Sequence, residues 1–108
     1  MQTWDLTTLD VAPHKPEVIE TEKEGRAIVV ELPAGEMLGD HQVHERAWLL
    51  AIFGSIELSG ADGGAVTVGP GTLTTFEPNE RHEVRAVEDS RLLLLLSPWP
   101  GVGHPSEA

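Results

Sequence analysis

The chain has 108 residues and a formal net charge of −11, from 18 acidic residues against 7 lysines and arginines. This length corresponds to one domain, so we expect residues 1–108 to form a single unit. The acidic balance excludes binding to nucleic-acid phosphates, which requires clustered lysine and arginine. Cysteine is absent, which excludes a disulfide scaffold, a thiolate zinc site and a cysteine nucleophile.

The sequence shows no targeting or membrane-spanning segment. The first residues, Met1 to Asp5, lack the basic start and apolar run of a signal peptide. The longest aliphatic run, Leu92 to Leu96, is too short to cross a bilayer. We therefore expect a cytoplasmic protein without a membrane partner.

After a proline-containing lead-in over residues 1–15, the pattern is one of short strands separated by glycine and proline turns. The expected strands are 18–20, 26–32, 47–53, 56–58, 65–68, 72–76, 82–87 and 91–96. Asp62-Gly63-Gly64 is a strong hairpin signal, because glycine accepts the positive φ that tight hairpins require. A proline-rich tail, 97–108, follows the last strand. This pattern predicts an all-β sandwich or barrel.

Two of the expected strands, 47–53 and 92–96, are apolar on both faces. One face of an antiparallel sheet usually meets water, so a strand of this kind needs a second covering layer. The N-terminal segment or another subunit can supply that layer, and we favour a homodimer. In the tail, we expect Trp99 to anchor on the barrel.

Histidines mark a candidate site. Of the five, His14 and His104 lie in proline-flanked terminal segments and are expected to be exposed. His41 and His44 precede one strand and His82 opens a later one. In a barrel these strand ends can meet at one mouth, where neutral imidazoles bind divalent metals.

At these residues the sequence resembles the cupin superfamily, small jelly-roll barrels with two short motifs. Gly35, His41 and Gly54 match the first motif in spacing, and Gly71 and His82 match the ends of the second, whose internal proline and glycine are absent. The resemblance covers residues 28–96. It implies an all-β fold, a single-domain cupin-like jelly-roll β-barrel.

The first motif also departs from the family pattern. Its second histidine belongs at position 43, which is Val43, and His44 stands one residue later. Its glutamate belongs at position 47 or 48, and these are Ala47 and Trp48. The usual ligand set is therefore incomplete.

Strand geometry leaves two ligand sets open. Side chains alternate faces along a strand, so His41 and His44 both point inward only if a bulge or loop residue lies between them. In a regular strand Glu45 would join His41 and His82 instead. We favour His41, His44 and His82, since three histidines with an open position form a well-attested catalytic metal site.

The resemblance implies a protein that binds a small molecule in the barrel mouth, through a divalent metal of unknown identity. Glu45 and Trp48 complete the expected pocket, with Glu45 a candidate base beside the metal ligands and Trp48 favoured as a packing residue. Cupins include dioxygenases, isomerases, decarboxylases and non-catalytic binders, so no catalytic residue is assigned. The alternatives are a metal-free ligand-binding or sensor module and a structural dimer.

Overall fold

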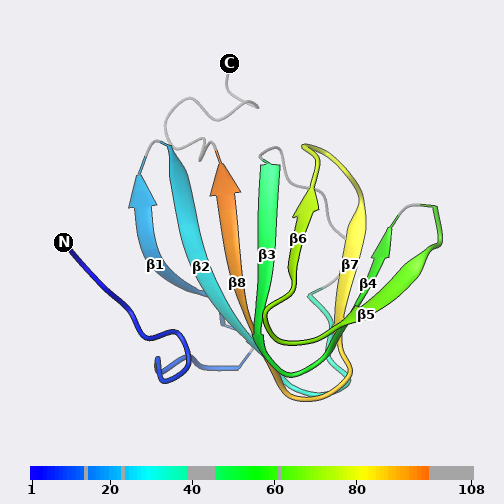
Figure 1. Ribbon diagram of the computed structural model, residues 1–108, viewed down its shortest axis with the longest axis horizontal. Helices are drawn as coiled ribbons and strands as arrows, with labels where there is room; N and C mark the ends of the chain where they lie inside the picture. The colour runs from blue at the N-terminus through cyan, green and yellow to red at the C-terminus, as the bar shows by residue number, and fades with distance from the viewer. Residues whose placement is uncertain (14, 23, 39–45, 61, 98–108) are drawn as a thin grey trace.

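The computed structural model describes residues 1–13, 15–22, 24–38, 46–60 and 62–97. These residues form eight β-strands and no helix, which confirms the predicted all-β fold (Figure 1). The strands are β1 (Glu17–Glu22), β2 (Gly25–Leu32), β3 (Arg46–Phe53), β4 (Ile56–Gly60), β5 (Ala65–Val68), β6 (Leu73–Phe76), β7 (His82–Ala86) and β8 (Ser90–Ser97). Nowhere in this described part does a helix occur that is long and apolar enough to cross a membrane.

The strands form two antiparallel sheets. The five-stranded sheet has the order β1-β2-β8-β3-β6, and the three-stranded sheet has the order β5-β4-β7. A short segment before residue 39 runs beside β7, where Met37 forms a bridge with Arg85 and the Leu38 N–H donates to the Val84 carbonyl at 2.9 Å. The first strand is longer than the predicted 18–20, because its exposed flanks pair with β2 in a hairpin.

The core lies between the two sheets and follows from side-chain alternation. On β3, Ala47, Leu49 and Ala51 point inward and are buried. Leu92 and Leu96 on β8 join them in one apolar cluster with residues of β2, β4, β6 and β7. Fully burying a leucine side chain contributes about 1.5–3 kcal/mol, so this cluster holds the two sheets together.

Glycine is required where the chain passes from β3 to β4. Gly54 has φ +94°, a conformation that side chains other than glycine rarely adopt. A Cβ atom there would collide with Ser90. Ser90 is fully buried and its hydroxyl bonds to the Ser55 backbone, accepting from the N–H at 3.0 Å. This turn is therefore fixed by shape and by hydrogen bonds.

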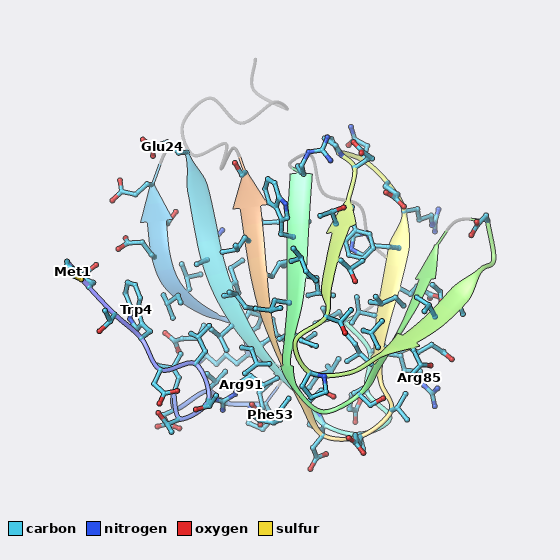
Figure 2. All side chains as sticks on the ribbon, viewed as in Figure 1. Met1, Trp4, Glu24, Phe53, Arg85 and Arg91 are labelled. Carbon is cyan, nitrogen blue, oxygen red and sulfur yellow. The ribbon has the colours of Figure 1, made fainter. Side chains whose placement is uncertain are left out.

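One end of the outer face of the five-stranded sheet is covered by the N-terminal segment. Arg91 on β8 is 7% exposed and its guanidinium donates to the Leu6 and Leu9 carbonyls at 3.1 and 2.6 Å. It also donates to Glu31 at 2.7 Å and lies 5.4 Å from the centre of the Phe53 ring (Figure 2). The N-terminal segment thus supplies part of the covering layer expected over the two-sided strands.

Candidate functional site

His82 lies at the start of β7 and points into the space between the sheets, where the residue is only 4% exposed. Its ring stacks on that of Phe76 at the end of β6, with centroids 3.9 Å apart and planes 10° from parallel. The intervening turn is closed by the Glu80 N–H, which donates to the Glu77 carbonyl at 3.0 Å, and Asn79 adopts φ +65°. This turn sets the position of the imidazole.

One nitrogen of the His82 ring is oriented by the backbone. Nδ1 lies 3.1 Å from the Glu80 carbonyl oxygen. The tautomer with its hydrogen on Nδ1 donates this hydrogen bond and carries its lone pair on Nε2. Histidines that bind metals commonly hold their second nitrogen against a carbonyl in this way, which fixes the ring and raises its basicity. The chemistry of His82 therefore fits a metal ligand or a hydrogen-bond acceptor for a bound molecule.

Both described ends of the segment 39–45 lie close to His82. At one end, Leu38 bonds to Val84, two residues along β7 from His82. At the other end, Ala47 pairs with Phe76, the residue on which the imidazole stacks. The start of β3, the end of β6 and the start of β7 all lie at one end of the molecule, at the top of Figure 1. We call this end the mouth.

An ion pair at the mouth joins the start of β3 to the turn that follows β6. The Arg46 guanidinium, at the start of β3, donates to the Glu77 carboxylate at 2.7 Å. Its hydrogen bond and positive charge hold the pKa of Glu77 below the ordinary value of 4.5, and the same contact raises the pKa of Arg46. Both side chains are more than a third exposed, so solvent screens the attraction. The pair positions the start of β3 beside the turn that leads to His82.

A cavity of about 300 Å³ lies at the mouth between the β4–β5 hairpin and β6. Leu58, Val66 and Phe76 give it apolar walls, and Thr74, Asp62 and Glu80 add hydroxyl and carboxylate groups. A small, mostly apolar space with a few polar groups is typical of ligand sites. Because Phe76 contacts both this cavity and the His82 ring, the cavity adjoins the candidate site.

The structure describes only part of the predicted site. His41, His44 and Glu45 lie outside the described residues, and His82 points inward as expected. Within the described ranges, no three histidine, aspartate, glutamate or cysteine side chains gather as a metal-binding group. Trp48, expected in the pocket, points to the outer face of β3, on the opposite side from the buried Ala47 and Leu49.

Sequence reasoning missed Phe76 and the Glu80 carbonyl as partners of His82. Alternation from Thr74 to Phe76 on β6 was a usable signal for an inward aromatic ring. The carbonyl contact has no such signal, because it depends on how the turn 77–81 folds back towards the ring.

A comparison with known protein families finds a match over most of this chain. A family profile for the cupin domain matches residues 28–98. That range contains β3 to β8 and β2 from residue 28 onward, and it includes the segment 39–45 and His82. No functionally curated protein matches the sequence.

Solved structures agree on the fold. An RmlC-like cupin from Desulfovibrio desulfuricans is 18% identical, with a TM-score of 0.82 over 91% of this chain and 97% of its own. An RmlC-like cupin with a double-stranded β-helix fold, from Methanocaldococcus jannaschii, is 17% identical, with a TM-score of 0.73 over 85% and 82%. KdgF from Halomonas is 22% identical, with a TM-score of 0.71 over 83% and 85%. At such identities the likeness extends to the fold alone.

Proposed function

The chain belongs to the cupin family, and we propose that it binds a small molecule in the barrel mouth through a divalent metal held by His41, His44 and His82. The observation that carries this proposal is the buried His82 ring, with Nδ1 held by the Glu80 carbonyl. A buried imidazole oriented in this way is suited to present Nε2 as a ligand.

The ends of the segment 39–45 support the choice of partners. Leu38 and Ala47 bond to strands on either side of the His82–Phe76 stack. His41 is three residues beyond Leu38 and His44 is three residues before Ala47, so both belong to a stretch that begins and ends beside this stack. When bound, a metal with three neutral ligands and open positions supplies Lewis-acid chemistry to a ligand oxygen.

The mouth cavity is the proposed place of the small molecule. Leu58, Val66 and Phe76 would contact its apolar part, and Thr74 would offer it a hydroxyl. Glu45 is proposed as a base beside the ligand set. No reaction is assigned, because the cupin fold serves both enzymes and binding proteins.

Metal binding tests the proposal directly. Purified protein loaded with Zn²⁺ and dialysed should retain close to one metal per chain by elemental analysis. His82→Asn should weaken Zn²⁺ binding by more than about tenfold in calorimetric titration, because it removes a ligand. His14→Asn, a change at a terminal histidine, is the matched control and should bind as the natural chain does. Circular dichroism checks that both variants fold.

The two ligand sets give different results in a further pair of variants. If His44 is a ligand, His44→Ala weakens Zn²⁺ binding strongly and Glu45→Gln does so only slightly. If Glu45 replaces it, the order is reversed. Protein that retains no metal after loading with Zn²⁺ and dialysis would overturn the metal proposal. A small molecule that raises the melting temperature equally with and without chelator would then favour the metal-free sensor. The expected cytoplasmic location stays a prediction, which cell fractionation would test.

A further inference from the structure

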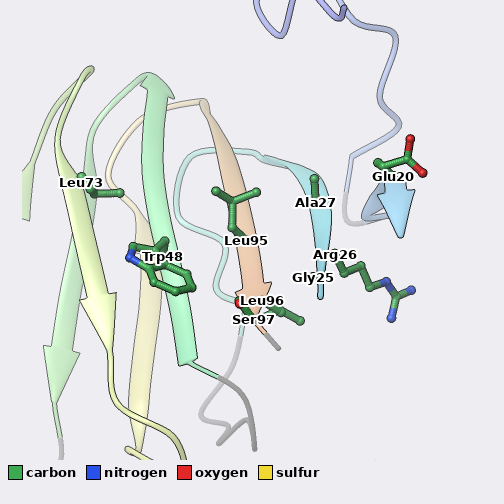
Figure 3. A pocket seen from close by; sticks show the side chains of 9 residues that line it. All are labelled: Glu20, Gly25, Arg26, Ala27, Trp48, Leu73, Leu95, Leu96 and Ser97. Carbon is green, nitrogen blue, oxygen red and sulfur yellow. The ribbon is translucent and has the colours of Figure 1, made fainter. Parts of the chain in front are cut away.

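A second apolar surface lies on the other side of the five-stranded sheet, away from the mouth cavity. It is a groove of about 510 Å³ over β2, β8, β3 and β6 (Figure 3). Ala27, Leu95 and Trp48 form one row across it, since Leu95 pairs with both of the others. Leu73 stands beside this row and Ser97 lies at its end. We call this surface the outer groove.

The outer groove exposes large apolar side chains. Leu73 is 59% exposed and Leu95 is 39% exposed. Removing such surface from water is favourable by about 25 cal/mol per Å². Arg91 holds the N-terminal segment over the other end of this face, but the outer groove is not lined by any residue of that segment. A further cover for the groove is therefore expected.

The chain itself supplies a segment that begins at the groove. Ser97, the last described residue of β8, lines the groove, and its hydroxyl donates to the Glu24 carbonyl at 3.0 Å. Residues 98–108 follow it. Ser97-Pro98 favours a turn. Trp99 is two residues beyond Ser97, and Leu95 is two residues before it. Each is thus about 7 Å from Ser97 along an extended chain. A reversal of the chain at Ser97-Pro98 would therefore bring Trp99 over Leu95.

Charge favours this segment as the cover of the groove over the homodimer partner that the two-sided strands led us to expect. Residues 98–106 contain no aspartate, glutamate, lysine or arginine, and they include Trp99 and Val102. A second copy would instead bring a net charge of −11 against another −11. Like charges oppose association. Pro98 and Pro100 also restrict the free segment, which reduces the entropy lost when it packs.

We propose that the C-terminal segment 98–108 folds back over the outer face of its own chain and packs Trp99 into the outer groove, against Leu95 and Trp48. It covers one end of the face as the N-terminal segment covers the other. This packing is independent of the metal proposal, because the groove and the mouth cavity share no lining residue.

The absence of cysteine allows a clean test in the full-length chain. A nitroxide is attached to Leu73→Cys, at the wall of the groove. The three tryptophans are replaced by 5-fluorotryptophan, and their ¹⁹F resonances are assigned by single replacements with phenylalanine. Val66→Cys is the matched control, because Val66 is 55% exposed and lies on the other sheet. Trp48 serves as the internal reference for a residue of the groove.

The proposal predicts that the nitroxide at position 73 abolishes the Trp99 resonance and that the nitroxide at position 66 leaves it visible. A second sample mixes nitroxide-labelled chains without fluorine and fluorinated chains without nitroxide. There the Trp99 resonance should persist, because the contact is within one chain. Loss of the resonance in the mixed sample would assign the groove to a second copy and overturn the proposal. Persistence in both samples would show that the segment lies elsewhere, which overturns it as well.

Discussion

The inner and outer faces of the five-stranded sheet are both apolar, but they are covered to different extents and by different means. The inner face packs against the second sheet through aliphatic side chains such as Leu49 and Leu92. On the outer face, a charged side chain, Arg91, holds the N-terminal segment through the backbone carbonyls of Leu6 and Leu9, and Glu31 on β2 orients its guanidinium. Apolar packing drives burial without fixing direction, whereas hydrogen bonds select one position for the covering segment.

The largest expected effect is in the inner face. Leu92 is fully buried, so Leu92→Ala should lower the free energy of unfolding by about 2–5 kcal/mol through lost burial and a residual cavity. Leu95→Ala, three residues along the same strand on the outer face, is the matched control and should cost clearly less. Urea denaturation measures both. Equal losses would contradict the assignment of inner and outer faces.

Breaking the Arg91 contacts should give the next largest effect. Arg91→Met keeps much of the apolar stem and removes the charged hydrogen bonds, each of which contributes about 1.5–3 kcal/mol. We expect a lower free energy of unfolding and faster proteolysis within residues 1–13. Arg85→Met is the control, because Arg85 lies 3.9 Å from Glu57 on the exposed surface. An N-terminal segment that remains protected in Arg91→Met would show that apolar contacts alone hold it.

The exposed pair at the mouth should contribute least. Arg46 lowers the pKa of Glu77 in the folded chain, so the pair stabilises the protein above the ordinary carboxyl pKa of 4.5. This stabilisation is lost as the pH falls through the lowered pKa of the folded state. The difference in unfolding free energy between the natural chain and Glu77→Gln should therefore be small at neutral pH and shrink in acid. The same comparison is then made in an Arg46→Gln background. If the effect of Glu77→Gln on the unfolding free energy depends on pH there as it does in the natural chain, the pairing is contradicted.

Sequence patterns predicted the inner face more fully than the outer one. Glycine and proline turns divided the chain into eight strands, and the spacing from Gly71 to His82 indicated the buried histidine. Trp48 illustrates the limit. When a strand is apolar on both faces, alternation alone cannot say which set of side chains enters the core.

The Arg91 contacts were also beyond sequence reasoning. Glu31 is sixty positions away in sequence, and the Leu6 and Leu9 groups that bind the guanidinium are carbonyls, which every residue carries. No residue pattern marks such a contact. The choice between His44 and Glu45 depends on a bulge at residues outside the described part, so it stays a prediction.

The most direct measurement on the mouth is anomalous diffraction from crystals of the full chain grown with Zn²⁺ and recorded at the zinc absorption edge. We expect one peak in the mouth about 2.0–2.1 Å from His82 Nε2, with nitrogen atoms of His41 and His44 at similar distances. Crystals that show no peak at His82, or that place the three imidazoles on separate surfaces, would contradict the proposed site.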